Sequence, residues 1–228
     1  TMADQAVFVG AAPAANSYLN IAAIVGAAWL TKADAVHPGY GFLAESADFA
    51  EACRQGDLIF VGPPADAIVR MADKVAARST VAGLGVPVVP GSPALPDEDA
   101  AAANADLAEK LGYPVLIKAA AGGGGRGMIL ANNRQELTAN LSVARAEAKA
   151  AFGDGTVYLE KFITNARHVE VQVLADDHGN VIHLWERDCS VQRRHQKLIE
   201  ETPCQILSPP LRRDMHEAAI AITRHVHY

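Results

Sequence analysis

A run of four glycines lies between a lysine and an arginine in this chain. Residues 115–128 read VLIKAAAGGGGRGM, and Lys118 ends the apolar segment that precedes the glycines. Because glycine has no Cβ, the backbone N–H groups of such a loop can approach an anionic ligand closely. Lys118 and Arg126 place cationic groups on both sides of the loop, as a polyphosphate requires. The segment therefore indicates nucleotide binding, although an isolated glycine run is equally typical of a surface loop.

Two common nucleotide-binding patterns do not describe this loop. The Walker pattern closes with Lys-Ser or Lys-Thr, and dinucleotide-binding folds open a helix with GxGxxG. Neither spacing occurs around residues 122–127. The sequence therefore disfavours both of those folds.

A second group of residues that could do chemistry lies at 186–197, which read ERDCSVQRRHQK. It contains five cations or potential cations, namely Arg187, Arg193, Arg194, His195 and Lys197. Such a run is usually a solvated face, but here two glutamines interleave it and a predicted strand leads into it. The pattern indicates a site for a small anion.

Two further segments are weaker candidates when each is taken alone. Lys74 lies within an apolar helical pattern, where a single lysine is most often a surface residue. Residues 37–43, HPGYGFL, follow the end of a predicted strand, which is where open parallel sheets bind ligands. The alternative for that segment is a Pro-Gly turn with packed aromatic rings.

Composition excludes several classes of protein. The 228 residues are 50% hydrophobic and 20% charged, which is ordinary for a globular protein. The formal net charge of -6 argues against broad nucleic-acid binding. Three cysteines without metal-type spacing favour neither a disulfide framework nor a zinc site, and we expect a reducing compartment. No segment has the length of a membrane span or the pattern of a targeting signal.

The elements that must position these residues form two modules and a hairpin. Strands at 6–10, 35–36 and 58–61 alternate with helices at 17–30 and 46–54, a βαβαβ pattern that predicts a parallel sheet. One or two helices follow over 65–84, and a proline-rich stretch at 86–99 begins the second module.

The second module reads as a βαβ-type lobe that would suit a mobile lid. It comprises helices at 99–111 and 134–151 and strands at 113–119, 127–131 and 157–163. Strict alternation then predicts a hairpin over 168–192 with its turn at 177–180. A final helix is predicted at 210–225.

Six segments occur together in one order: HPGYGFLAE, ADK, VLIKAAAGGGGRGM, YLEKFI, ARHVEVQVLAD and ERDCSVQRRHQK. With them, the whole chain resembles biotin carboxylase, the ATP-grasp component of acetyl-, propionyl- and methylcrotonyl-CoA carboxylases and of pyruvate carboxylase. The resemblance implies an α/β (α+β) ATP-grasp fold with a partial N-terminal parallel βαβ domain at 1–61 and a helical linker at 62–88. A mobile lid subdomain at 89–163 and the start of an antiparallel C-terminal subdomain at 164–228 would follow.

The resemblance also implies a role for individual residues. Residues that match nucleotide-site positions of the family are Lys74, Lys118, Gly124, Gly125, Glu160, Lys161, Phe162, Ile163, His168, Gln192 and His195. Within that set, residues 160–163 match the segment that holds adenine, and the glycines match the flap over the phosphates. Lys197 matches the lysine that binds bicarbonate. Tyr40 and Gly41 match positions beside the biotin ring.

The implied activity is that of an ATP-dependent ligase. ATP would phosphorylate bicarbonate to carboxyphosphate, whose breakdown would release carbon dioxide beside biotin. Positioning and charge neutralisation carry most of phosphoryl transfer, which agrees with the lysines and the flap. The implied partners are a biotin carboxyl carrier domain and a carboxyltransferase component, with homodimer formation and a cytoplasmic location, or the mitochondrial matrix in a eukaryote. Neither nucleic acid nor a membrane is implied.

The chain departs from the family pattern at both ends. The resemblance places an Asn-Arg-Gly segment before Thr1, and it places the paired glutamates that bind Mg²⁺ beyond Tyr228. Because Mg²⁺ needs carboxylate oxygens to bridge phosphates, we expect these 228 residues alone not to turn over ATP. Two alternatives stay open: a non-catalytic nucleotide-binding or interaction protein, and another ATP-grasp ligase in which Lys197 holds a different anion.

Overall fold

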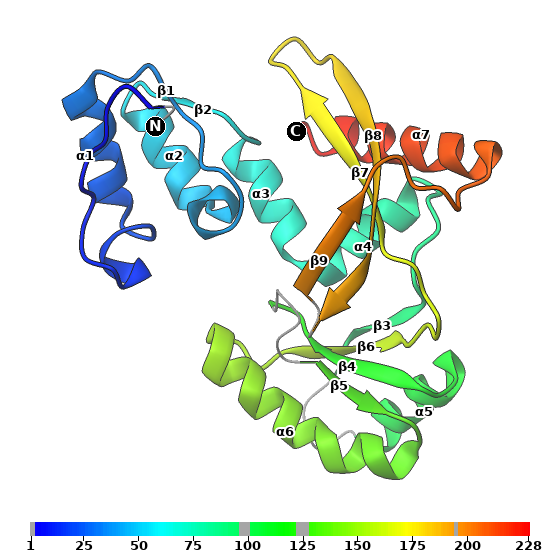
Figure 1. Ribbon diagram of the computed structural model, residues 1–228. Helices are drawn as coiled ribbons and strands as arrows, with labels where there is room; N and C mark the ends of the chain where they lie inside the picture. The colour runs from blue at the N-terminus through cyan, green and yellow to red at the C-terminus, as the bar shows by residue number, and fades with distance from the viewer. Residues whose placement is uncertain (1–2, 96–100, 122–127, 194–195) are drawn as a thin grey trace. The chain divides into compact units, whose positions relative to one another are not determined.

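The computed structural model describes residues 3–95, 101–121, 128–193 and 196–228 (Figure 1). The chain divides into two compact units. One comprises Thr1–Ala72 with His225–Tyr228, and the other comprises Asp73–Arg224. The division falls between helices α3 and α4, which are Ala65–Ala72 and Lys74–Gly83. Each unit is described separately.

The first unit contains a short parallel sheet covered by helices. Strand β1 (Ala35–Val36) pairs in parallel with β2 (Ile59–Phe60), and α2 (Ala47–Gln55) connects the two. The other elements are α1 (Ile21–Thr31) and two short 3-10 helices, η1 (Ala14–Asn16) and η2 (Phe42–Glu45). Phe49 and Cys53 are buried at the centre of a hydrophobic core to which both long helices contribute. The expected parallel β-α-β connection is thereby confirmed.

Two expectations for the first unit were wrong. Residues 6–10 form no strand, and within the described residues the sheet contains only β1 and β2. Apolar residues at strand spacing need a hydrogen-bonding partner, and residues 6–10 have none in this sheet. Helix α1 begins at Ile21 rather than near residue 17, because the Asn20 side chain accepts from Ala23 N at 3.1 Å and caps it there.

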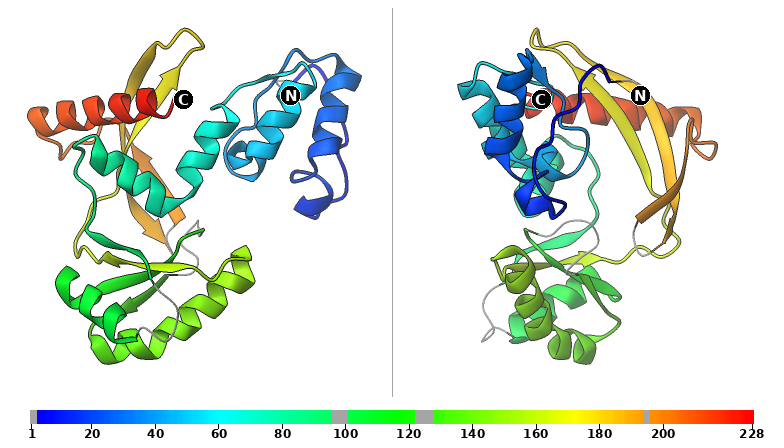
Figure 2. Two further views of the ribbon diagram at one scale, coloured as in Figure 1. Left: turned by 180° about the vertical axis from the view of Figure 1, so that it is seen from behind. Right: turned by 60° about the vertical axis from the view of Figure 1, so that its left-hand side comes forward.

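The second unit begins with a helix and a four-stranded antiparallel sheet. The strand order is β3-β6-β4-β5, with bounds Gly91–Ala94, Val157–Lys161, Val115–Ala119 and Met128–Ala131. Helices α5 (Ala101–Leu111) and α6 (Arg134–Phe152) lie side by side on one face of this sheet (Figure 2). Ile117, Leu137 and Leu159 are fully buried between the sheet and these helices.

The connection through α6 is a split form of the expected βαβ unit, because β5 and β6 are both antiparallel to β4 and therefore run parallel to each other. Strands β5 and β6 are not neighbours, because β4 lies between them and pairs antiparallel with both. Strand β3 was not expected at all. Its sequence, GSPA, contains the two residue types that are least frequent in strands.

A three-stranded sheet and a long helix complete the second unit. Strand β8 (Val181–Arg193) lies between β7 (Val169–Ala175) and β9 (Gln196–Glu201), and α7 (Pro209–His225) follows. The predicted hairpin of β7 and β8 is confirmed, and the Asp176 side chain accepts from Asn180 N at 2.9 Å in its turn. A register shift near Trp185, whose φ is 68°, marks a bulge in β8. Among the described residues, no helix is both long and apolar enough to cross a bilayer.

Candidate functional site

Lys118 and Glu160 form an ion pair on one face of the β4–β6 pair. Lys118 Nζ lies 2.7 Å from Glu160 Oε1, and each side chain is 18% exposed. The alternation of β4 buries Val115 and Ile117 on the opposite face against the helices and leaves Lys118 on this one. Tyr158, directly opposite Lys118 in the sheet, is also buried here. Burial is the largest cause that raises the Tyr158 pKa to about 12, and the negative charge of Glu160 adds to it.

Lys74 lies at the same cluster, although it comes from a helix. Burial lowers the Lys74 pKa, the positive charge of Lys118 lowers it further, and the negative charge of Glu160 opposes both effects. The Asp73 side chain caps α4 by accepting from Val75 N at 2.8 Å and from Ala76 N at 3.1 Å. Lys74 is therefore the first residue of a helix whose start is anchored by its neighbour. Two lysines and one carboxylate converge, and the cluster carries a net positive charge.

The segment after Glu160 is held against the start of β4. Lys161 Nζ donates to the carbonyl oxygens of Gly112 at 2.7 Å and Tyr113 at 3.0 Å. Phe162 N donates to the Pro114 carbonyl at 3.1 Å, so this N–H is used within the fold. Ile163 is 50% exposed and offers apolar surface. The Lys161 side chain therefore has a structural role, and its nucleotide-site role stays a prediction.

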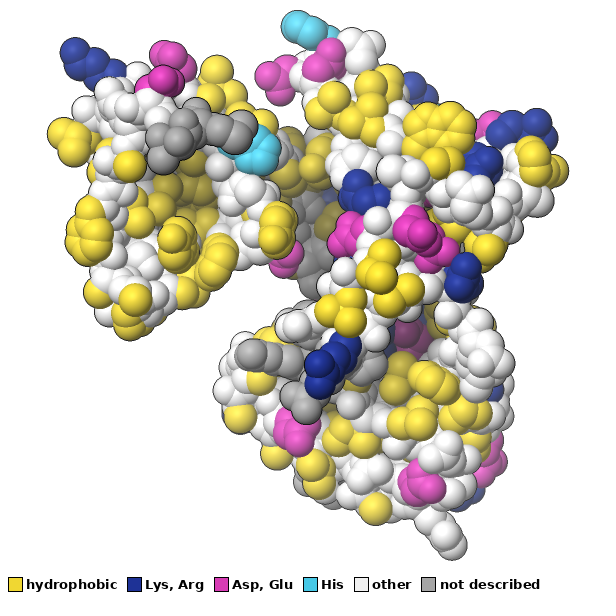
Figure 3. Space-filling view, in the orientation of Figure 1, with side chains coloured by type: hydrophobic (Ala, Val, Ile, Leu, Met, Phe, Trp, Pro, Cys, Tyr) yellow, Lys and Arg dark blue, Asp and Glu magenta, His cyan; other side chains and the backbone are white. Residues whose placement is uncertain are grey.

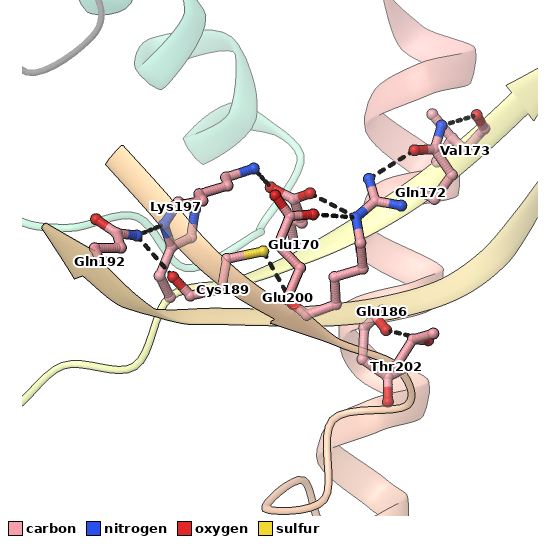
Figure 4. Close-up of polar contacts among 11 residues, drawn as sticks. Glu170, Gln172, Val173, Glu186, Cys189, Gln192, Lys197, Glu200 and Thr202 are labelled. Atoms are coloured by element: carbon pink, nitrogen blue, oxygen red, sulfur yellow. Dashed lines mark hydrogen bonds and ion pairs between the residues drawn. The ribbon is translucent and has the colours of Figure 1, made fainter. Parts of the chain in front are cut away.

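A second cluster of charges crosses the three-stranded sheet. Lys197 Nζ on β9 forms an ion pair with Glu170 Oε2 on β7 (Figure 4). Arg187, on the middle strand, donates from Nε to Glu170 Oε1 at 2.8 Å and lies 3.6 Å from Glu200. Burial acts to raise the Glu170 pKa, but the hydrogen bonds from Lys197 and Arg187 outweigh it, and the pKa is lowered. The hydrogen bond to Glu170 raises the Lys197 pKa, so the pair is charged at neutral pH.

His168 and Gln192 join the same sheet. Gln192 Nε2 lies 2.6 Å from His168 Nδ1 and donates to the Cys189 carbonyl at 2.8 Å. Gln192 is also the register partner of Lys197. Two residues predicted for the nucleotide site, His168 and Gln192, are therefore close to Lys197, which is predicted for bicarbonate, because β7, β8 and β9 are adjacent.

The same cluster contains three possible metal ligands. Ligand atoms of Glu170, Cys189 and Glu200 all lie within 4.8 Å of one another. Arg187 and Lys197 already neutralise the two carboxylates. Burial, followed by the charge of Glu170, raises the Cys189 pKa and favours the neutral thiol, which is a weak ligand. This group does not fit Mg²⁺, which binds through oxygen atoms.

Sequence analysis missed a buried carboxylate that faces α7. Glu186 is fully buried and accepts from Arg212 Nε at 2.7 Å, while His216 Nε2 lies 2.7 Å from its other oxygen. These bonds join β8 to α7, which lies beside it in Figures 1 and 2. Arg187, the next residue, points to the opposite face. The alternation of side chains along β8 could have placed Glu186 and Arg187 on opposite faces of the sheet. Nothing in the sequence identifies Arg212 and His216 as the partners of Glu186.

Some predicted residues lie elsewhere or outside the described part of the chain. Tyr40 and Gly41 belong to the first unit, where Tyr40 is 95% exposed and Gly41 adopts φ 68°. Gly124, Gly125 and His195 lie outside the described residues, as do Arg126 and Arg194. In Figure 3, acidic and basic side chains gather over the β7–β9 sheet, and hydrophobic side chains lie near its hairpin. Leu174, Ile182 and Leu184 are exposed there.

Comparison with known proteins gives consistent matches over the whole chain. Residues 1–68 match the family model described as "Biotin carboxylase, N-terminal domain", and residues 73–228 match "Carbamoyl-phosphate synthase L chain, ATP binding domain". The biotin carboxylase of Haemophilus influenzae is 51% identical over 214 residues, which are 94% of this chain and 48% of that protein. Biotin carboxylase 1 of Bacillus subtilis is 51% identical over 227 residues, which are 100% of this chain and 50% of that protein.

Solved structures agree with these relatives. The biotin carboxylase–β-γ-ATP complex of Campylobacter jejuni has a TM-score of 0.90 at 50% identity, covering 96% of this chain and 49% of that one. The biotin carboxylase domain dimer of Hydrogenobacter thermophilus 2-oxoglutarate carboxylase, with MgADP, ADP and bicarbonate, has a TM-score of 0.90 at 45% identity. That match covers 100% of this chain and 49% of the other. The chain spans about half the length of the curated relatives that it matches.

Proposed function

Because the chain belongs to the biotin carboxylase family, we propose that it forms the ATP- and bicarbonate-binding part of an enzyme that carboxylates carrier-bound biotin. The observation that carries the proposal is the convergence of Lys74, Lys118 and Glu160. Two lysines and one carboxylate leave one positive charge for a polyphosphate. The reaction class is ATP-dependent ligation with formation of a C–N bond.

The nucleotide would lie between the glycine loop and the β4–β6 face. Lys74 and Lys118 would neutralise phosphate charge, and Gly124 and Gly125 would cover the phosphates with backbone N–H groups. Residues 160–163 would hold the adenine ring by backbone hydrogen bonds and apolar contact. Phe162 N is already used by Pro114, so Ile163 and the remaining backbone groups must supply those contacts.

Bicarbonate would bind at Lys197, with His168, Gln192 and His195 completing the phosphate side of the site. A bicarbonate oxygen would attack the γ-phosphorus, the bond to ADP would break, and carboxyphosphate would form. Cleavage of carboxyphosphate would give carbon dioxide and phosphate, and phosphate would remove the proton from the biotin nitrogen that attacks carbon dioxide. Lysine side chains carry out positioning and charge neutralisation in this scheme.

Magnesium would neutralise phosphate charge when bound, but the described residues do not fit it. The candidate carboxylates Glu170 and Glu200 are engaged by Arg187 and Lys197. We therefore assign the Mg²⁺ ligands to residues other than those described, and we derive no step through the metal.

Partners and location are part of the same proposal. Tyr40 and Gly41 would lie beside the biotin ring, which a carrier domain would deliver, and a carboxyltransferase component would use the product. One relative is the methylcrotonoyl-CoA carboxylase subunit alpha of Glycine max, which is 50% identical over 226 residues. The Hydrogenobacter domain is a dimer, and we propose a homodimer in the cytoplasm for this protein.

Phosphate release tests the proposal in the protein at its native length. With ATP present, we expect release to require both bicarbonate and free biotin, or to be stimulated by biotin above a bicarbonate-dependent rate. Lys149, an exposed lysine of α6, provides the matched control, because α6 packs on the face of the sheet opposite Lys118 and Glu160. Nucleotide binding without bicarbonate-dependent release would support the non-catalytic alternative. Release that requires an amine or carboxylate instead of bicarbonate would support another ATP-grasp ligase.

A further inference from the structure

Arg187 occupies the centre of the charge cluster on the three-stranded sheet. It lies on β8, between Glu170 of β7 and Glu200 of β9. Its Nε donates to Glu170 Oε1 at 2.8 Å and lies 3.6 Å from Glu200 Oε2, and its Nη2 donates to Gln172 Oε1 at 2.8 Å. The planar guanidinium therefore holds two neighbouring side chains of β7 through separate nitrogen atoms.

The charges in this cluster balance only because Arg187 is present. Glu170 and Glu200 carry two negative charges, and Lys197 and Arg187 carry two positive charges. Without Arg187, Lys197 would be the single cation paired with these two carboxylates among the described residues, and the charge of the group would be -1. A small anion that approached Lys197 would then be repelled rather than attracted.

The position of Glu170 depends on the same arginine. Arg187 Nε donates a hydrogen bond to Oε1 of Glu170, and Lys197 Nζ donates to Oε2 of the same carboxylate. Figure 4 shows the contact between Lys197 and Glu170. The two cations thus fix the carboxylate from opposite sides. Loss of one of them would free Glu170 to rotate and to pair more closely with the other.

We propose that Arg187 is a positioning residue that makes Lys197 competent to bind a small anion. It does so by neutralising Glu170 and Glu200 and by holding Glu170 in place. The inference rests on the proposed function, in which that anion is bicarbonate. Arg187 does not touch the substrate in this account, because its Nε and Nη2 groups are taken by protein side chains.

The test compares the bicarbonate KM and the ATP KM of Arg187→Gln with those of the unaltered protein at its native length. We expect Arg187→Gln to raise the bicarbonate KM on the order of tenfold and to change the ATP KM less than about twofold. The double variant Arg187→Gln with Glu200→Gln restores the charge balance, and most of the bicarbonate affinity should return. Arg134→Gln is the matched control, since Arg134 forms an exposed pair with Glu109 on α5 and should leave both constants unchanged.

Other results would overturn the inference. An unchanged bicarbonate KM, equal rises of both constants, or a double variant as impaired as the single one would each contradict it. If the unaltered protein releases no phosphate with bicarbonate, the proposed reaction fails, and direct binding of ¹³C-bicarbonate measured by NMR then decides about Arg187. Saturable binding that Arg187→Gln weakens would sustain the inference. Equal binding, or none in the unaltered protein, would refute it.

Discussion

Lys197 and Glu170 lie on the two outer strands of a three-stranded sheet and form an ion pair across the middle strand. The ammonium group of Lys197 is therefore already paired with a carboxylate of the protein. An incoming anion must share its ammonium group with a carboxylate whose second oxygen is bound by Arg187. Such sharing favours a small, weakly held anion over a large one.

Replacing Lys197 by Gln removes the cation and keeps a side chain of similar length. We expect the bicarbonate KM to rise by at least about tenfold, because one charge makes a large share of the contact with a small anion. Nucleotide affinity should change by less than about twofold. Steady-state phosphate release at varied bicarbonate and varied ATP measures both constants, and an equal loss of both would contradict the role assigned to Lys197.

Replacing Lys118 by Gln should act on the other ligand. Lys118 is mostly buried and faces Glu160, so its loss removes the proposed phosphate partner and leaves a carboxylate uncompensated. We expect nucleotide affinity to fall by about 2 kcal/mol, which is roughly 30-fold in Kd. Titration calorimetry with ATP measures the change, and Lys149→Gln on exposed α6 should leave Kd as it is. Similar losses in both variants would mean that overall charge, rather than the cluster, binds the nucleotide.

Asp73 offers a test of how Lys74 is positioned. Its side chain accepts two backbone N–H groups at the start of α4, and Asn can make the same bonds. Asp73→Ala should therefore lower the free energy of unfolding by about 1 kcal/mol and weaken nucleotide binding, whereas Asp73→Asn should nearly preserve both. Urea unfolding and nucleotide titration provide the two readouts. Equally weak binding in Asp73→Asn and Asp73→Ala would point to the aspartate charge instead of the cap.

The pairing of Glu186 with α7 predicts a pH dependence of stability. Burial acts to raise the Glu186 pKa, but hydrogen bonds from Arg212 and His216 outweigh it and hold the pKa below the ordinary value of 4.5. A lowered folded-state pKa contributes stability that is complete above the unfolded-state pKa and is lost as the pH falls through the folded-state value. The unaltered protein should therefore lose this contribution only in acid.

Glu186→Gln measures that contribution directly. At pH 7 we expect it to lower the free energy of unfolding by about 3 kcal/mol, because the partly buried Arg212 is left beside a neutral group. The difference from the unaltered protein should shrink as the pH falls below about 4.5. The exposed Glu147 of α6 provides a control whose change to Gln should cost less than about 0.5 kcal/mol at any pH. A difference that grows in acid would show that the sign of the shift is wrong.

Sequence patterns predicted most helices and strands that have a clear hydrophobic periodicity and missed those that lack it. Helix α6 and the β7–β8 hairpin were expected within a few residues of their observed bounds. Strand β9 was missed because all six of its residues are exposed, and no alternation of apolar and polar residues marks it. Residues 6–10 are a short apolar run, but they have no partner strand among the described residues.

For the candidate site, sequence motifs identified individual residues but not the residues that they contact. Lys118, Glu160, Lys74 and Lys197 could each be named from motifs, but their partners depend on strand register. The Lys118–Glu160 pair joins residues 42 positions apart, and the Lys197–Glu170 pair crosses a third strand. Glu186 was passed over because its partners lie on a helix whose docking no local pattern describes.

Titration of the protein with ATP, followed by calorimetry, tests the central claim most directly, namely that Lys74, Lys118 and Glu160 form the base of a nucleotide site. We predict saturable binding of one ATP per chain, lost or strongly weakened when Lys74 and Lys118 are both changed to Gln and unaffected by Lys149→Gln. The absence of saturable binding in the unaltered protein, or equal binding by the double variant, would contradict it.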